Sequence, residues 1–167
     1  MSFCQGPESI LAVRDALQEC AGTSGGAIRL IAKIETPEAV ENIGAIVGCD
    51  ETWGVMVARG DLAYEGDRAD LLHSALRIIR EARRQGKYAI MATEMLDSMI
   101  ARPTPTRAEI FDISLAVALG VDAVMTSGET AVGRYPVDAV RVMREIVTRA
   151  EERRSELRGL LAGIVSE

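Results

Sequence analysis

Short apolar runs alternate along the chain with longer stretches in which apolar residues recur at helical spacing. The four short runs span residues 28–35, 52–57, 87–92 and 122–126. Each is followed by polar or glycine-containing residues, a pattern that predicts buried strands giving way to helices. The run starts lie 24, 35 and 35 residues apart, which is about the length of one βα unit. The spacing therefore predicts repeated β-to-α units.

Local signals predict where the helices begin. Thr36-Pro37 places a capping hydroxyl before a proline, which is favoured at the first helical position. Thr106 and Glu109 have the spacing of a capping box, in which each side chain satisfies a main-chain amide near the other. Tyr135-Pro136 opens a long final helix, and a further helical stretch is predicted over 69–85.

The predicted order of elements indicates the α/β class with parallel (β/α) units. Four or five such units make half of an eight-stranded (β/α)8 barrel, which typically takes about 250 residues. An open doubly wound sheet is the alternative. The sequence has neither GxGxxG after a strand nor GxxxxGK[ST], so nucleotide-binding open sheets lack their usual signature here.

Composition narrows the class of protein further. Hydrophobic residues make up 48% of the 167 residues, enough for a core, and only six residues are aromatic. The net charge of −6 argues against general binding of nucleic acid or of a membrane surface. No apolar run approaches the roughly 20 residues of a membrane span, and the first residues lack a secretion signal, so we expect a cytoplasmic protein.

The three cysteines are odd in number and form no CxxC pair. That usage suits a reducing compartment better than a disulfide framework. We expect Cys4, Cys20 and Cys49 to be small buried hydrophobic residues.

Candidate chemistry lies at the ends of the predicted strands, because parallel α/β folds bind ligands at the carboxyl ends of their strands. Lys33 and Glu35 end the first strand on one face, and Asp61 follows the second. Two carboxylates from neighbouring strands suit Mg²⁺ or Mn²⁺, and a nearby lysine suits a phosphoryl or enolate group. A salt-bridge network that also includes Arg59 is the alternative interpretation.

Polar residues also end the third and fourth predicted strands. Thr93 follows the third strand, and its hydroxyl can simply bond its own main chain. Ser127 and Glu129 follow the fourth strand and can equally mark a helix start. His73, the sole histidine, lies in a helical pattern and is predicted to be a surface or boundary residue.

Five strings, in order, resemble signatures in the second half of the pyruvate kinase catalytic domain: IAKIE, MVARGDL, ATEMLDSM, RPTPTRAE and SGETAVGRYP. The resemblance covers about residues 28–150, and residues 1–3 resemble the end of the preceding barrel strand. It implies the C-terminal half of a TIM (β/α)8 barrel over 1–150, with a C-terminal helical extension over 151–167.

The resemblance also implies a reaction and a site. Phosphoenolpyruvate and ADP would give pyruvate and ATP, a step of glycolysis. Glu35 and Asp61 would hold Mg²⁺ or Mn²⁺, and Lys33 would stabilise the phosphoryl group and the enolate. The amides of Ala58, Gly60 and Asp61 would receive the substrate carboxylate with the help of the Thr93 hydroxyl. Ser127 and Glu129 would lie near a proton relay.

The chain departs from the family pattern at three places, and one of them is near Leu115, where an asparagine expected in the helix after RPTPTRAE is replaced. Ala63 stands where the family has glycine, and Glu94 stands where it has glutamine, which adds negative charge near the barrel mouth. The family's K⁺ site, its other phosphoryl contacts and its nucleotide-covering domain fall outside the resemblance.

We therefore expect little activity from the chain alone. We also expect either a homo-oligomer or a complementary half-barrel chain as partner, because a half barrel leaves strand edges uncovered. Two other functions stay open. One is a metal-dependent pyruvate-enolate lyase or aldolase, and the other is a non-catalytic half barrel that dimerises.

Overall fold

The structure is a computed structural model that describes residues 1–21 and 28–165. The glycine-rich connection at 22–26 lies outside the described residues. The chain divides into two compact units, Met1–Ile90 and Met91–Glu167, which are described in turn. The four strands pair in the order β1-β2-β3-β4.

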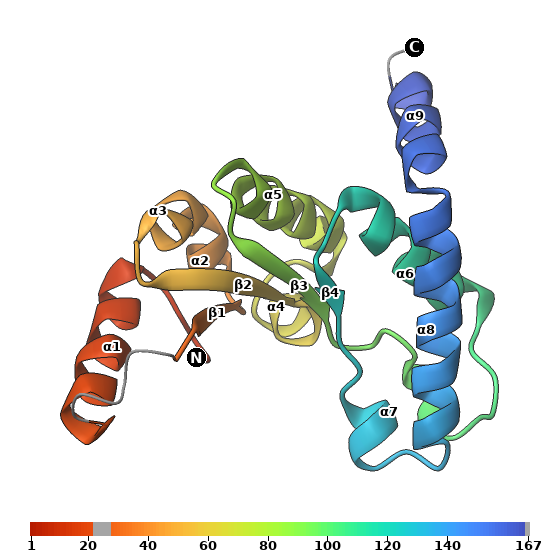
Figure 1. The fold of residues 1–167 in the computed structure, drawn as a ribbon, viewed down its shortest axis with the longest axis horizontal. Helices are drawn as coiled ribbons and strands as arrows, with labels where there is room; N and C mark the ends of the chain where they lie inside the picture. The colour runs from red at the N-terminus through yellow and green to blue at the C-terminus, as the bar shows by residue number, and fades with distance from the viewer. Residues whose placement is uncertain (22–27, 166–167) are drawn as a thin grey trace. The chain divides into compact units, whose positions relative to one another are not determined.

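The first unit alternates strands with helices (Figure 1). Its elements are α1 (Pro7–Ala21), β1 (Leu30–Ile34), α2 (Pro37–Glu41), α3 (Ile43–Gly48), β2 (Thr52–Ala58), α4 (Arg59–Glu65), the 3₁₀ turn η2 (Arg68–Asp70), α5 (Leu71–Arg84) and the start of β3 (Tyr88–Ala92). Strands β1 and β2 are parallel, and Lys33 lies opposite Met56. The parallel α/β class predicted from the sequence is confirmed.

One face of the β1–β2 pair is fully buried. Ala32, Ile34, Val55 and Val57 each have 0% exposure, and they alternate along the two strands as the pleat requires. Helices α3 and α5 pack against β2. On the opposite face the residues are only half-buried, so the helices cover one side of this pair completely and leave the other partly open.

Close aromatic packing occupies the amino-terminal part of β2 and β3. The rings of Trp53 and Tyr88 stack with centroids 4.5 Å apart, and the Arg29 guanidinium lies 4.7 Å from the centre of the Trp53 ring. Gly54 lies so close to Tyr88 that a Cβ added to it would be 2.7 Å from the Tyr88 carbonyl oxygen. Only a residue without a side chain fits there.

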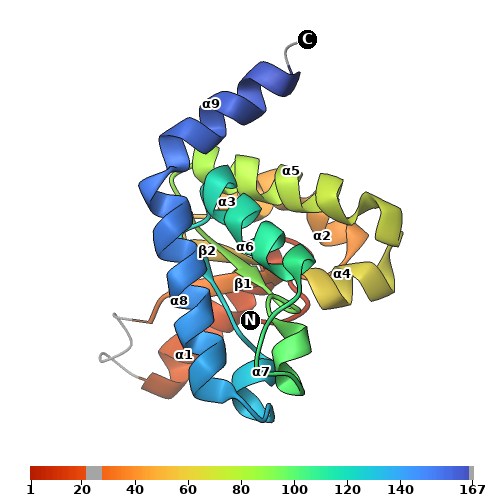
Figure 2. The same ribbon diagram turned by 90° about the vertical axis from the view of Figure 1, so that its right-hand side faces the viewer.

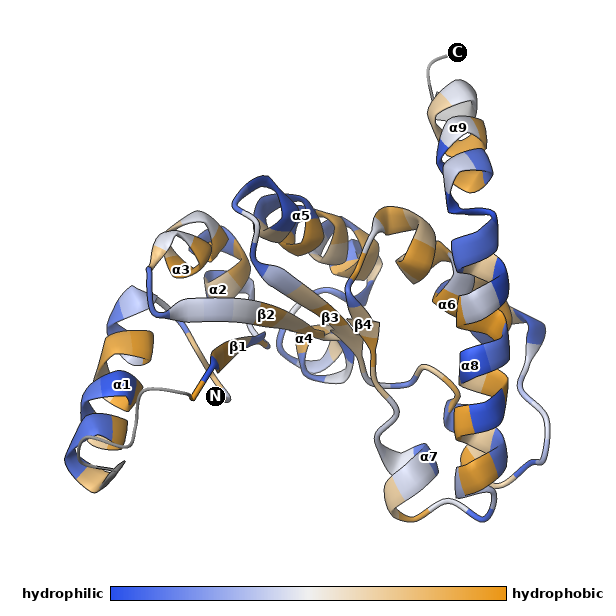
Figure 3. Ribbon diagram, in the orientation of Figure 1, coloured by the Kyte–Doolittle hydropathy of each residue, from blue (hydrophilic) through white to orange (hydrophobic). Residues whose placement is uncertain are grey.

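The second unit is mainly helical. It contains the end of β3, the 3₁₀ turn η3 (Asp97–Ile100), α6 (Arg107–Leu119), β4 (Ala123–Val124), α7 (Gly128–Ala131), α8 (Pro136–Glu152) and α9 (Arg154–Val165). Helix α8 packs against α6 and α7 (Figure 2). Hydrophobic and hydrophilic residues alternate around α8 (Figure 3), as expected for a helix with one face packed on its neighbours.

The capping signals form as predicted. Thr36 Oγ1 accepts a hydrogen bond of 3.2 Å from the Ala39 amide at the start of α2. Thr106 and Glu109 form a complete capping box at the start of α6, and Gly120 ends that helix in the left-handed conformation. Glu109 also accepts from the Ser98 amide at 2.7 Å and from the Ser98 hydroxyl at 2.6 Å. The capping box therefore also fastens η3 to α6.

The boundaries of several elements differ from the prediction. The fourth strand, predicted over 122–126, shrinks to Ala123–Val124, although the Met125 amide still donates to Met91 O at 3.0 Å. Helix α1 was not predicted, because it buries little of its apolar surface: Ile10 is buried but Leu11 is 47% exposed. Helix α9 lies within the extension predicted over 151–167, and the predicted boundary near residue 150 stays a prediction.

The cysteine prediction holds only in part. Cys4 is buried as expected, and burial raises the pKa of its thiol to about 11. Cys49 is half-buried and Cys20 is exposed, so the expectation is wrong for Cys20, which lies at the end of an exposed helix. Among the described residues, no helix is both long and apolar enough to cross a membrane.

Candidate functional site

The Lys33 ammonium contacts Oε1 of Glu35 at the carboxyl end of β1. The two residues are one strand period apart and share a face, so the pairing follows from the pleat. The Glu35 side chain is 2% exposed and the Lys33 side chain 30% exposed. The ammonium also reaches Ser2 Oγ at 3.3 Å. A buried carboxylate is therefore paired with a cation that still faces solvent.

The second oxygen of Glu35 is held by the first residues of the chain. The Phe3 amide donates to Glu35 Oε2. This segment runs along β1, since the Lys33 amide donates to Met1 O at 2.9 Å and the Met1 amine donates to Ile31 O at 2.9 Å. Sequence reasoning did not assign a role to the Phe3 amide. The resemblance of residues 1–3 to the end of a neighbouring strand was the available signal.

Asp61 joins the same cluster from the next strand. Strand β2 ends at Ala58 and α4 begins at Arg59, so Gly60 and Asp61 lie in the first helical turn. The Asp61 side chain lies close enough to the Glu35 carboxyl group to affect that group's pKa. The structure thus places Lys33, Glu35 and Asp61 near one another, and their role as a site stays a prediction.

The charge state of Glu35 results from opposing effects. Burial raises the pKa of its carboxyl group, but the Lys33 ammonium, the Phe3 amide and the Asp61 side chain lower it, and the net pKa lies below the ordinary value. Glu35 is therefore ionised at neutral pH. An ionised buried carboxylate beside a second carboxyl group attracts a further cation.

The donor set fits part of a divalent-metal site. Within residues 1–21 and 28–165, no group of three or more His, Cys, Asp and Glu side chains is arranged to hold a metal ion. Glu35 and Asp61 supply two neighbouring carboxyl groups. Mg²⁺ commonly takes one or two protein carboxylates and completes its shell with water and substrate oxygens. The two residues present therefore fit such an ion without a third protein ligand.

The residues predicted at the other two strand ends lie in the second unit. Thr93 and Glu94 directly follow β3, and both have positive φ angles, +66° and +52°. Two successive non-glycine residues in the left-handed region are unusual, and a β-branched threonine there is strained. Ser127 is half-buried and precedes α7.

Glu129 is 1% exposed and accepts two main-chain hydrogen bonds. Its Oε1 accepts from the Leu96 amide at 2.8 Å, and its Oε2 accepts from the Ser127 amide at 2.6 Å. The structure thus joins Ser127 and Glu129 to the loop that follows Thr93. The Leu96 amide was not predicted as a donor, because the identity of a residue does not show what its main-chain amide will bind.

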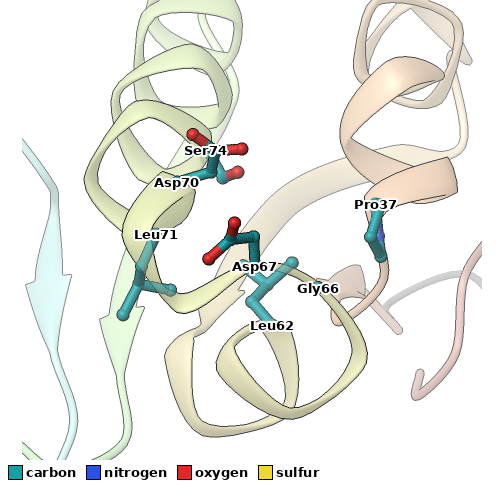
Figure 4. Close-up of a pocket in the computed structure, with 7 residues that line it drawn as sticks. All are labelled: Pro37, Leu62, Gly66, Asp67, Asp70, Leu71 and Ser74. Atoms are coloured by element: carbon teal, nitrogen blue, oxygen red, sulfur yellow. The ribbon is translucent and has the colours of Figure 1, made fainter.

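A cavity of about 110 Å³ lies between the starts of α2 and α5 and the end of α4 (Figure 4). Its lining combines apolar and acidic side chains: Pro37, Leu62, Gly66, Asp67, Asp70, Leu71 and Ser74. The Asp67 carboxylate accepts a hydrogen bond of 2.8 Å from the Ala69 amide, so it caps the turn that follows. The cavity is separate from Lys33, Glu35 and Asp61 in its lining. His73 is exposed nearby on α5, as predicted.

Comparison with known proteins shows the family of this chain. The sequence profile described as "Pyruvate kinase, barrel domain" matches residues 1–140. The chain is 44% identical over 151 residues to a pyruvate kinase of Bacillus licheniformis, which covers 90% of this chain and 25% of that protein. It is 45% identical over 152 residues to a pyruvate kinase of Clostridium acetobutylicum, covering 90% and 31%.

A solved structure shows the same fold. The crystal structure of a pyruvate kinase from Cryptosporidium parvum superposes with a TM-score of 0.85 at 40% identity, covering 90% of this chain and 30% of that one. The chain thus spans about a quarter to a third of the length of the relatives it matches.

The parallel βα units and the match to the barrel-domain profile define the chain as a segment of a (β/α)8 barrel. The chain belongs to the pyruvate kinase family.

Proposed function

We propose that this chain is the part of a pyruvate kinase barrel that carries the divalent-metal site and the catalytic lysine. The reaction is transfer of the phosphoryl group of phosphoenolpyruvate to ADP, giving pyruvate and ATP. The observation that supports it is the cluster at two adjacent strand ends, where the Lys33 ammonium contacts the buried Glu35 carboxylate and the Asp61 side chain lies near it.

Lys33 has the chemistry that phosphoryl transfer needs. Its ammonium is partly exposed and lies at the carboxyl end of β1, where a bound substrate is reached from solvent. When the phosphoryl group leaves, negative charge develops on it and on the enolate oxygen, and a fixed cation stabilises both. Glu35 orients the ammonium through their contact, so Lys33 does not have to be ordered during the reaction.

Glu35 and Asp61 would hold Mg²⁺ or Mn²⁺. When bound, the ion supplies positive charge to the substrate oxygens. The Phe3 amide holds the second oxygen of Glu35 in place. The amides of Gly60 and Asp61 lie in the first turn of α4. By family resemblance they and the Ala58 amide would receive the substrate carboxylate.

Three residues of the second unit have expected roles as well. By family resemblance the Thr93 hydroxyl would meet the substrate carboxylate, and Ser127 and Glu129 would lie near the proton that pyruvate gains. The exposed Glu94 adds negative charge beside Thr93. Replacing it with glutamine, the family's residue, should therefore strengthen binding of the anionic substrate.

We infer that the chain works with a partner that covers its sheet, either a second copy or a complementary half-barrel chain. The apolar side chains of Ile31, Met56 and Ile90 are only half-buried on the face that α3 and α5 do not cover. Burying such residues is favourable by about 25 cal/mol per Å². Sedimentation equilibrium of the purified chain tests the second copy, and a monomer at micromolar concentration would contradict that form of the partner.

Metal binding tests the proposal. Titration of the chain with Mn²⁺, followed by electron paramagnetic resonance, should show a site that Glu35→Gln and Asp61→Asn each weaken at least about tenfold, since each removes one charged ligand. Glu65→Gln is the matched control, because Glu65 is an exposed carboxylate on α4 and should leave the affinity unchanged. Unchanged affinity in both site variants would overturn the assignment.

A further inference from the structure

Glu129 connects two loops of the second unit through one buried carboxylate. The Leu96 amide donates to Glu129 Oε1 at 2.8 Å and lies just before η3. The Ser127 amide donates to Oε2 at 2.6 Å and lies just before α7. The residue itself is 1% exposed. The segment that follows β3 and the segment that follows β4 are therefore fastened to the same side chain.

A carboxylate in this position is costly unless both oxygens are bonded. Burying a charged group without partners costs several kcal/mol, whereas hydrogen bonds from amides to a carboxylate are among the stronger ones in proteins. Removing the carboxylate would also leave the Leu96 amide, which is buried, without this acceptor. The arrangement therefore stabilises one relative position of the two loops.

The loop that Glu129 holds contains the strained pair. Thr93 and Glu94 have φ of +66° and +52°, and Leu96 follows two residues later with 0% exposure. Left-handed non-glycine residues persist only where the surrounding structure holds them, because each costs of order 1–3 kcal/mol. The Glu129 to Leu96 bond is a contact near enough to do this.

The segment that carries Glu129 has little freedom to move. A Cβ at Gly133 would lie 2.3 Å from the Glu129 carbonyl oxygen, and one at Gly128 would lie 3.0 Å from the Ile100 side chain. The Arg134 amide donates to Ile100 O at 2.9 Å, which joins the end of this segment to η3. The main chain that carries Glu129 is thus packed closely against the segment that it holds.

We propose that Glu129 is a positioning residue that holds Thr93 and Ser127 in a fixed relation. The two hydrogen bonds that Glu129 accepts, from Leu96 and Ser127, are called the clamp. The clamp holds the left-handed turn at Thr93 and Glu94 and so fixes the position of the Thr93 hydroxyl. That the presented hydroxyl meets phosphoenolpyruvate rests on the proposed function. Each oxygen of Glu129 accepts from one main-chain amide, and holding the main chain is the role that these two contacts give it.

Nuclear magnetic resonance of the full chain tests the clamp. In the unaltered chain, a scalar coupling across the hydrogen bond should link the Leu96 amide nitrogen to the Glu129 carboxyl carbon, and both amides should exchange at least about 100-fold slower than in an unfolded peptide. Neither amide belongs to the interior of a helix or strand. Fast exchange of both amides in the unaltered chain would overturn the proposal, whatever any variant does.

Glu129→Gln keeps the size of the side chain but replaces one acceptor oxygen with a donor. At least one of the two amides should then exchange about tenfold faster, and the Cα shifts of Thr93 and Glu94 should move away from left-handed values. Glu109→Gln is the matched control: Glu109 also accepts from two amides, those of Ser98 and Thr106, so it should affect Ser98 but leave Ser127 unchanged. Unaltered Thr93 and Glu94 shifts in the Glu129 variant would refute the positioning role.

A ligand titration separates this inference from the proposed function. Phosphoenolpyruvate with Mg²⁺ should shift the Thr93 amide signal, with a half-saturating concentration about fivefold higher in Glu129→Gln, while Mn²⁺ affinity stays within about twofold. If the unaltered chain shows no such shift but the exchange results hold, the substrate assignment fails and the clamp stands. If ligand binding is intact and the variant's loops are unchanged, the clamp fails and the function stands.

Discussion

The Lys33 ammonium contacts Glu35 Oε1 at the end of β1, and the Asp61 side chain, from the first turn of α4, lies near the same carboxyl group. Glu35 is buried whereas Lys33 is partly exposed, so the lysine is the member of the cluster that can exchange partners with a bound ligand. In this arrangement the ammonium takes a position beside two carboxyl groups that a divalent cation would also occupy. The Lys33 ammonium and a divalent metal ion should therefore compete for the position beside these carboxyl groups.

Lys33→Met should raise the affinity of the chain for Mn²⁺ when no substrate is present. Removing the ammonium removes a repulsion of order 1 kcal/mol at a partly exposed site, so the dissociation constant should fall about fivefold. Phosphoenolpyruvate should bind more weakly to the same variant, because its phosphoryl group loses a cation. Paramagnetic resonance titration measures the metal arm, and calorimetry measures the substrate arm.

Lys87→Met provides the control for loss of a lysine elsewhere in the same unit. The Lys87 ammonium donates to the carbonyl oxygens of Cys49 and Thr52, at 3.2 and 2.6 Å, and not to the acidic cluster. Lys87→Met should therefore leave the Mn²⁺ affinity unchanged. A Lys33 variant that binds Mn²⁺ less tightly than the unaltered chain would show that the lysine supports the metal site instead of competing with it.

Glu109→Gln should destabilise the chain by about 1 kcal/mol at neutral pH, because it weakens the capping box of α6 and the bonds to Ser98. Burial raises the pKa of Glu109, but its bonds to Ser98 and Thr106 outweigh this and hold the pKa below its ordinary value of 4.5. The unfolded chain therefore binds the proton more readily. The stabilisation is complete above about pH 4.5 and is lost as the pH falls through the lower folded value.

Urea denaturation of both forms between pH 3 and pH 7 measures this dependence. The difference in free energy of unfolding should shrink as the pH is lowered. Glu145→Gln on α8 is the control, since Glu145 is exposed on a neighbouring helix. A difference that is constant over the whole range would mean that the charge of Glu109 contributes nothing.

Glu94→Gly should stabilise the chain by about 1 kcal/mol relative to Glu94→Ala. Glu94 is exposed and has φ of +52°, so the comparison isolates the main-chain cost of the left-handed conformation. Glycine adopts this conformation without a Cβ penalty, although it loses more entropy on folding. Thermal or urea unfolding of the two variants gives the difference, and equal stability would show that the turn is not strained.

Gly54→Ala and Gly44→Ala should change stability in opposite directions. A Cβ on Gly54 would lie 2.7 and 2.8 Å from the Tyr88 main chain and Cβ, so β2 and β3 must separate, at a cost of about 2 kcal/mol. A Cβ on Gly44, in α3, would meet only the Glu81 carboxylate at 3.8 Å, so alanine should stabilise the helix by up to about 1 kcal/mol. The same chemical change therefore tests close packing against helix propensity. Calorimetric melting temperatures should show opposite shifts.

The chain's own residues determined most of the element order. Alternating apolar runs predicted the strands to within a few residues because burial on a helix-covered sheet demands them, as at Ala32 and Ile34. Thr36, Thr106 and Glu109 predicted their helix starts because capping depends on residues only three positions apart. Helix α1 was not predicted because it buries little apolar surface. Strand β4 was predicted too long because its length depends on pairing with residues distant in the sequence.

The site divides in the same way. Lys33 and Glu35 could be placed on one face from the strand period alone, a local property of two neighbouring residues. That the Phe3 amide and Asp61 meet the same carboxylate depends on which strands lie side by side, and only folding brings those segments together. The Leu96 amide at Glu129 was likewise decided by tertiary structure, because main-chain donors are identical in every residue but proline and leave no mark in a sequence.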